Sequence, residues 1–201
     1  MLKRGQSMPV RVCGRIEDLP APSLPEVAVA GRSNVGKSSL LNVLLGQKAA
    51  HISRTPGKTR TINFYDTGRG FLLVDLPGYG FARVSKTVKE AWGQLVERYL
   101  AGRKNLLGLL LLIDARHPPT ALDLQMRQWL EAYGIRTLYV ATKADQVSRG
   151  THRAIVQRLR EELGLDPLAP IQIVSSRTGE GREALRQSIQ DLLLDAPGRR
   201  S

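Results

Sequence analysis

The stretch of sequence that decides the fold is Gly31-Arg32-Ser33-Asn34-Val35-Gly36-Lys37-Ser38. It fits the phosphate-loop pattern, in which two glycines let the backbone curl so that successive amides point at phosphate oxygens. In that pattern the lysine places a positive charge at the β- and γ-phosphates, and the final hydroxyl can bind Mg²⁺. The apolar run at 27–30 suits a buried parallel strand, and a helical pattern follows the motif and ends in a glycine. This context predicts a nucleotide-binding protein.

A second motif, Asp75-Leu76-Pro77-Gly78, closes the apolar run at 71–75. A carboxylate at the end of a strand can hold Mg²⁺ through water, and the glycine can offer its amide to the γ-phosphate. An ordinary strand followed by a Pro-Gly turn would show the same residues. The spacing after a phosphate loop favours the functional interpretation.

A third motif, Thr142-Lys143-Ala144-Asp145, resembles the guanine-specificity motif, which is usually Asn-Lys-x-Asp. Asp145 can accept two hydrogen bonds from guanine, whereas adenine lacks that pair of donors. The stem of Lys143 can lie over the base, and the Thr142 hydroxyl can still hold the loop. The alternative is an ordinary charged loop after a strand. A weaker signal is Val174-Ser175-Ser176, similar to a loop whose backbone amide contacts guanine O6.

A fourth stretch, RTPGKTRTINF at 54–64, completes a set that resembles the EngB type (also called YihA or YsxC) of the TrmE–Era–EngA group of GTPases. The resemblance covers residues 27 to 194. It implies a P-loop NTPase with the fold of a Ras-like G domain, which binds GTP and GDP with Mg²⁺ and hydrolyses GTP. It also implies a factor that assists assembly of the large ribosomal subunit and is needed for normal cell division and septation.

The resemblance places Gly57-Lys58-Thr59-Arg60-Thr61 in the first switch, against the nucleotide. Thr59 would bind Mg²⁺ alongside Ser38 and contact the γ-phosphate, while Asp75 would hold the metal through water. Thr-Pro-Gly-Lys is also a good turn sequence. In that alternative Thr59 or Thr61 is simply an exposed hydroxyl.

The residue that orients the attacking water is harder to identify from the sequence. Ras-like enzymes use a glutamine directly after Asp-x-x-Gly, but this chain has Tyr79, and a phenol cannot both accept from water and donate to phosphate. In related GTPases an asparagine at the position of Asn34 helps to hold K⁺, whose charge can replace an arginine finger. Alternatively, Asn34 only tolerates the backbone geometry of the loop. The candidate catalytic residues are Lys37, Thr59, Asn34 and Gly78.

The balance of charge is strongly basic, because 30 Lys and Arg against 18 Asp and Glu give a net charge of +12. Such a chain favours a polyanionic partner, although arginines also serve solvation and are common in GC-rich genomes. Contacts would be to phosphate and shape. Ribosomal RNA fits this pattern, and the resemblance to the family implies ribosomal RNA and ribosomal proteins as the partners and not DNA. Arg54 and Arg60, beside the first switch, either meet RNA or supply charge to the reaction.

Composition argues against several other classes of protein. No run approaches the roughly 18 apolar residues of a membrane span, and no helix pattern has the basic and apolar faces of a membrane-surface helix. The N-terminus lacks a secretory signal, so we expect a cytoplasmic protein, and we expect a monomer. The single Cys13 cannot form an intramolecular disulfide, and the histidines lack metal-ligand spacing.

Repeated alternation of strands and helices predicts an α/β fold, with a mixed, mainly parallel sheet of about six strands and helices on both faces. We expect the G domain to span 26–195, after a basic extension at 1–25 and before a short basic tail at 196–201. The extension either adds an edge element or is mobile. Expected strands are 26–30, 61–66, 70–75, 106–114, 137–141 and 171–174, and expected helices after the phosphate loop are 85–101, 120–132, 150–164 and 181–194.

Three functions are compatible with these motifs. The first is a GTP-hydrolysing assembly factor whose nucleotide state orders the segments around Thr59 and Gly78. The second is a regulatory switch that binds a protein partner in cell division and hydrolyses little GTP. The third is an ATP-using kinase that shares only the phosphate loop, against which Asp145 argues.

Overall fold

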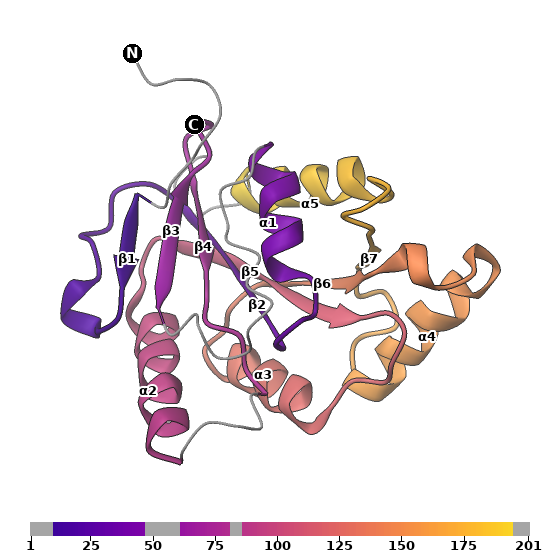
Figure 1. The fold of residues 1–201 in the computed structure, drawn as a ribbon, viewed down its shortest axis with the longest axis horizontal. Helices are drawn as coiled ribbons and strands as arrows, with labels where there is room; N and C mark the ends of the chain where they lie inside the picture. The colour runs from indigo at the N-terminus through magenta and orange to yellow at the C-terminus, as the bar shows by residue number, and fades with distance from the viewer. Residues whose placement is uncertain (1–9, 47–60, 81–85, 195–201) are drawn as a thin grey trace.

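The computed structural model describes residues 10–46, 61–80 and 86–194, with the backbone alone for 86–92. Its strands form one seven-stranded sheet in the order β1-β3-β4-β2-β5-β6-β7 (Figure 1). They are β1 (Arg11–Cys13), β2 (Glu26–Gly31), β3 (Ile62–Asp66), β4 (Leu72–Asp75), β5 (Leu106–Asp114), β6 (Thr137–Thr142) and β7 (Ile171–Ile173). The helices are α1 (Lys37–Leu45), α2 (Lys86–Gly102), α3 (Ala121–Ala132), α4 (His152–Leu163) and α5 (Arg182–Leu194). β3 is antiparallel to both neighbours, and the other pairs are parallel.

The predicted strands and helices are all present, with bounds close to those expected, and β3 and β4 form the predicted antiparallel pair. The sheet has seven strands, where about six were expected, because the N-terminal extension adds an edge element, one of the two alternatives for it. The additional strand is β1, which pairs with β3 and buries Cys13 opposite Ile62. Its three residues are too few for an alternating pattern to be recognised in the sequence.

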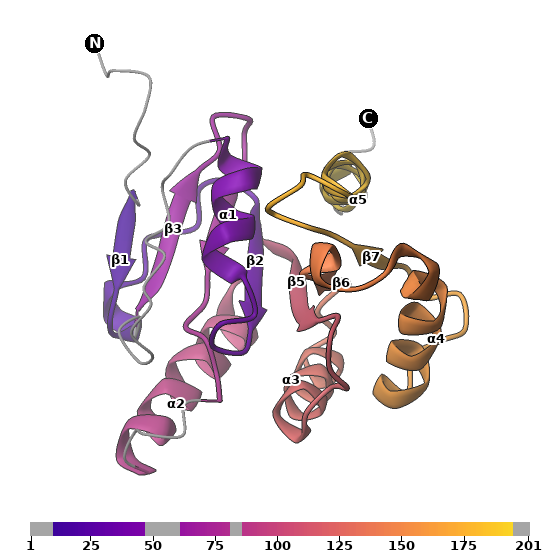
Figure 2. The same cartoon turned by 45° about the vertical axis from the view of Figure 1, so that its right-hand side comes forward.

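Strand β2 shows how the sheet separates two hydrophobic layers. Val27 and Val29 pack with residues of α1 and α5, whereas Ala28 and Ala30 pack with residues of α2 and α3. A parallel strand covered on both faces needs no polar side, which explains the uninterrupted apolar run. α4 covers the face that carries α3, so helices lie on both faces as predicted (Figure 2). Within the described ranges, none of these helices has the length and apolar character to cross a bilayer.

A buried ionic network fixes the amino end of β2. Glu26 is fully buried and pairs with Arg103, whose Nη2 lies 2.5 Å from Oε1 of Glu26. The Tyr99 hydroxyl donates to Oε2 at 2.9 Å, and the Asn105 amide donates to Oε1 at 3.1 Å. Arg103 also donates to the carbonyl of Pro20 at 2.6 Å. The network therefore joins the segment between β1 and β2 to the end of α2.

Replacing Arg103 by Ala should lower the free energy of unfolding by about 3 kcal/mol or more, because Glu26 would keep a buried charge without its cationic partner. Urea denaturation followed by circular dichroism measures this. Arg98→Ala is the matched control, since Arg98 is exposed on α2 and its loss should change stability by about 0.5 kcal/mol or less. Equal losses in the two variants would contradict this interpretation of the network.

Candidate nucleotide-binding site

The predicted motifs meet at one edge of the sheet. The phosphate loop follows β2, Asp75 ends β4, Thr142 ends β6 and Ser175 comes shortly after β7. These strands are parallel, so their carboxyl ends point the same way, and this is the edge at which open α/β sheets bind ligands (Figure 1). Four segments that are distant in sequence thus contribute to one site.

The phosphate loop has the curled backbone that its sequence predicts. Gly36 and Asn34 both adopt left-handed conformations, with φ of +104° and +64°. At Gly31 a Cβ would lie 2.8 Å from Cγ1 of Val35 and 3.0 Å from Cβ of Leu112, so no larger residue fits there. Gly36 directly precedes α1 and makes no side-chain cap, which leaves the first amides of that helix to face an anion.

Lys37 and Asp75, from the first and second motifs, contact each other. The Lys37 ammonium donates to Oδ1 of Asp75, and the two side chains are 9% and 5% exposed. Ser38 follows in the first turn of α1. A hydroxyl and one buried carboxylate are hard oxygen ligands of the kind that Mg²⁺ accepts together with phosphate oxygens and water. The residues present therefore fit the predicted metal, although no cluster of three or more His, Cys, Asp or Glu suited to a metal occurs in the described part of the chain.

The segment Asp75–Gly78 lies directly against the phosphate loop. The Tyr79 amide donates to the Gly31 carbonyl at 3.3 Å, and the Ser33 amide donates to the Tyr79 carbonyl at 2.9 Å. A Cβ at Gly78 would lie 3.4 Å from the same Gly31 carbonyl. Gly78 thus lies beside the loop, and its predicted contact with the γ-phosphate stays a prediction. The side chain of Leu76 is 1% exposed in the core, so any contact that it makes with a ligand is through its backbone.

The side chain of Tyr79 is buried against α3, so it does not take the water-orienting role that glutamine has in other GTPases. It is 3% exposed, and its hydroxyl donates to Oδ1 of Asp123 on α3 at 2.8 Å. Burial, with the Asp123 carboxylate beside it, raises the pKa of the phenol well above its ordinary value. Tyr79 therefore stays protonated and directed at α3.

The hydroxyl of Thr142 does hold the loop of the third motif. It donates to the carbonyl of Val35 at 2.7 Å, and the carbonyl of Ile113 lies 3.1 Å from the same oxygen as a second acceptor for its single proton. It therefore joins the phosphate loop to β5 and β6, the task for which a hydroxyl was expected to replace the usual asparagine amide. Next to it, Lys143 has a left-handed backbone with φ of +61°.

Asp145 has two partners within the site. Its Oδ1 accepts from the Ser175 hydroxyl at 2.6 Å, and its Oδ2 lies 2.8 Å from Nε of Arg177. The hydrogen bond from Ser175 is the main cause that lowers the pKa of Asp145, so it is a carboxylate at neutral pH. The Val174 carbonyl accepts from the Ala144 amide, and the Ser175 amide donates to the Glu180 carbonyl. The amide of Ser176 is therefore the candidate donor to guanine O6.

Three residues of this edge were not singled out in the sequence. Asp114 accepts from Lys143 at 2.7 Å through Oδ2, and from the amide and guanidinium of Arg116. Burial opposes its ionisation, but the hydrogen bonds from Arg116 and Lys143 hold the pKa of Asp114 well below its ordinary value. The other two residues are Arg116 and Arg177, which is the partner of Asp145. Asp114 has a visible signal, since it ends an apolar run at the ligand edge, but its partner Lys143 is distant in the sequence.

The first switch can be placed only in part. Gly57, Lys58, Thr59 and Arg60 lie outside the described residues, so their predicted contacts with Mg²⁺ and nucleotide stay predictions. Thr61 is described, and its hydroxyl donates to Oδ1 of Asn63 at 3.0 Å, just before β3.

A small cleft borders the phosphate loop. It has a volume of about 170 Å³ and joins the loop to the end of β5 and to Lys143, with Asn34, Asp114 and Arg116 in its lining. A larger, more open groove of about 900 Å³ runs between α4 and β7 and is lined by Arg153 and Arg160. The smaller cleft is the one that connects the phosphate-binding and base-binding motifs.

Comparison with known proteins agrees with this geometry. The family described as "50S ribosome-binding GTPase" matches residues 26–143. The probable GTP-binding protein EngB of Alkaliphilus oremlandii is 49% identical over 87% of this chain and 85% of its own length. The EngB of Pelotomaculum thermopropionicum is 51% identical over 86% and 87%.

Solved structures give the same result for the fold. A crystal structure of a probable GTP-binding protein engB superposes with a TM-score of 0.74 and 25% identity, over 85% of this chain and all of that one. Era in complex with MgGDPNP and nucleotides 1506–1542 of 16S ribosomal RNA has a TM-score of 0.67 at 22% identity, over 84% of this chain and 56% of Era. The second likeness is evidence for the shared fold alone.

Replacing Asp145 by Asn should lower the affinity for GDP and GTP by about 100-fold or more, because the two guanine donors would then meet one acceptor and one donor. The same variant should gain affinity for xanthine nucleotides, whose C2 carbonyl accepts from the new amide. Titration with fluorescent guanine and xanthine nucleotides measures both effects. Asp191→Asn, at an exposed carboxylate on α5, is the control. Unchanged GDP affinity in the Asp145 variant would remove this residue from the site.

Proposed function

The chain belongs to the EngB family of GTP-binding proteins and is a GTPase. On that premise we propose that it assists assembly of the large ribosomal subunit in a nucleotide-dependent way, and that it is needed for normal cell division and septation. The observation that carries the proposal is the meeting of the phosphate loop, Asp75–Gly78 and the Asp145 loop at one edge of a fold that matches a family of ribosome-binding GTPases.

We propose that the nucleotide lies along this edge, with its phosphates on the phosphate loop and its base at Asp145. Lys37 would then bind the β- and γ-phosphates, and Asp145 would accept from the guanine N1–H and amine. Ser38, Asp75 through water, and Thr59 would hold Mg²⁺, which supplies neutralising charge at the β- and γ-oxygens. Gly78 would donate its amide to the γ-phosphate, so that its position reports whether GTP or GDP is bound.

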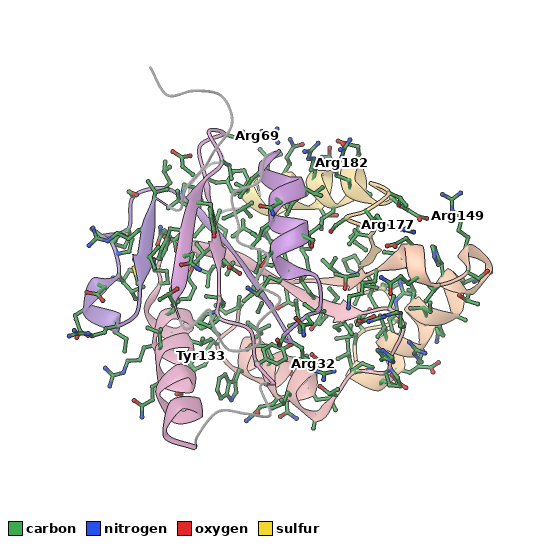
Figure 3. All side chains as sticks on the ribbon, in the orientation of Figure 1. Arg32, Arg69, Tyr133, Arg149, Arg177 and Arg182 are labelled. Carbon is green, nitrogen blue, oxygen red and sulfur yellow. The ribbon has the colours of Figure 1, made fainter. Side chains whose placement is uncertain are left out.

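Charge supports a ribosomal partner. The net charge of +12 favours a polyanion, and guanidinium groups extend from segments that flank the base-binding loops. Arg149 and Arg177 are 85% and 76% exposed, and Arg182 is 46% exposed (Figure 3). Such side chains contact RNA phosphates and shape without reading sequence. Ribosomal RNA and ribosomal proteins of the large subunit or its precursor are the proposed partners, and a monomer in the cytoplasm is the proposed acting form.

Co-sedimentation with large ribosomal subunits tests the ribosomal part. The protein should pellet with subunits when loaded with a non-hydrolysable GTP analogue, less so with GDP, and the association should weaken as salt rises, because phosphate contacts release counterions. Asp145→Asn is the control, and a xanthine analogue should restore its binding. If the protein pellets in neither nucleotide state, the regulatory switch that binds a protein partner becomes the better interpretation.

We further propose that GTP hydrolysis is slow by itself and is stimulated by K⁺, by the ribosomal particle, or by both. Asn34 is exposed at the phosphate loop, and its φ of +64° shows that it also has the backbone role. Asn34→Gly separates the two roles, because glycine keeps the left-handed backbone and lacks the carboxamide. We expect faster hydrolysis in K⁺ than in Na⁺, and loss of this difference in the variant with GTP affinity retained. Identical rates in the two salts would eliminate the role of K⁺.

A further inference from the structure

Tyr79 and Asp123 form a buried pair that the binding of phosphate and base does not use. The two residues are 3% and 2% exposed. The Tyr79 hydroxyl lies 2.8 Å from Oδ1 of Asp123, although 44 residues separate them in the chain. Because the acceptor is charged and the bond is shielded from water, it is stronger than a typical surface hydrogen bond.

Asp123 is itself fixed by the start of α3. Its Oδ2 accepts from the Thr120 amide at 2.8 Å and from the Thr120 hydroxyl at 2.7 Å. The carboxylate therefore caps α3 with one oxygen and holds the phenol with the other. Its position is set by a helix whose residues Met126 and Leu130 are buried in the main core.

The backbone of Tyr79 is in turn joined to the phosphate loop. Its amide donates to Gly31 and its carbonyl accepts from Ser33, which forms a short parallel bridge between Arg32 and Tyr79. Gly78 is the preceding residue, and a Cβ added to it would lie in van der Waals range of Gly31 and Ser33. Contacts therefore run without a break from α3, through Asp123 and Tyr79, to Gly78.

We propose that Asp123, acting through the buried hydroxyl of Tyr79, is a positioning residue that holds the Gly78 amide where the γ-phosphate of GTP reaches it. The proposal rests on GTP binding and is independent of the ribosomal function. Its consequence is specific to one nucleotide state, because GDP has no γ-phosphate for Gly78 to bind. Tyr79 occupies the position that glutamine has in other GTPases, but it anchors the segment that carries Gly78 and does not orient water. Burial keeps its phenol protonated, so it remains a donor throughout the physiological pH range.

The test is Tyr79→Phe, which removes only the hydroxyl. Affinity for a non-hydrolysable GTP analogue should fall about five- to tenfold, as expected for one charged hydrogen bond lost from the anchor. Affinity for GDP should change by less than about twofold, since GDP does not reach Gly78. Asp123→Asn leaves one acceptor oxygen for the donors of Tyr79 and Thr120 and removes the charge, so it should show a loss in the same direction. If the Phe variant does not fold, the Asn variant decides.

Two controls separate anchorage from general stability. Tyr133→Phe makes the same chemical change at a phenol that donates to the Glu97 carboxylate at 2.8 Å, on the exposed surface after α3 (Figure 3). Arg103→Ala, which breaks the buried ion pair at the remote amino end of β2, should lower the melting temperature without changing the ratio of the two affinities. If Tyr79→Phe and Asp123→Asn leave the ratio of GTP-analogue to GDP affinity unchanged, the pair is only structural and the proposal is wrong.

Discussion

The close approach of Gly31 to Val35 and Leu112 is the constraint on which the site depends. It places the phosphate loop directly on β5, with no room for a side chain at the turn. The Thr142 hydroxyl then joins the Val35 carbonyl to that of Ile113, so the base-binding loop is fixed to the same point. One tight turn therefore sets the distance between the groups proposed to bind phosphate and those proposed to bind the base, so loops from separate strands are held in register for one nucleotide.

The two ends of β2 differ in how their buried charged groups are paired. At the amino end, Glu26 receives donors from three side chains and is sealed in the core, so its charge has a fixed environment. At the carboxyl end, the contact found within the described ranges is the pair of Lys37 with Asp75. A pair with one contact is more easily rearranged than a network with several, because fewer buried groups lose a partner. Stability is thus concentrated at the end of the strand that is remote from the nucleotide.

Local sequence patterns were enough to predict the elements of the domain. Apolar runs of four or more residues and glycine-closed helical patterns are local signals, and they place β2, β5 and α1 near their observed bounds. The sequence does not decide whether β1 is a strand, because its three residues are too few to show a periodic pattern. The strand forms through its pairing with β3. The partners of Tyr79 and Lys143, which are Asp123 and Asp114, were missed for a related reason. One sequence contains no signal for which of several carboxylates a distant side chain will meet.

The two carboxylates of the site are each paired with a cation. This pairing explains how a buried carboxylate can exchange one partner for another when a ligand binds. Asp75 is paired with Lys37 and Asp145 with Arg177, each a cation from another motif. An unpaired buried carboxylate is costly, so each of these cations offsets part of the cost of burying its partner. Guanine donors can replace Arg177, whose side chain is 76% exposed and so easily returned to water, while the Ser175 hydroxyl keeps its hold on Oδ1. Binding of guanine would thus exchange one set of hydrogen-bond donors for another. The binding free energy then does not have to offset the cost of burying an unpaired charge.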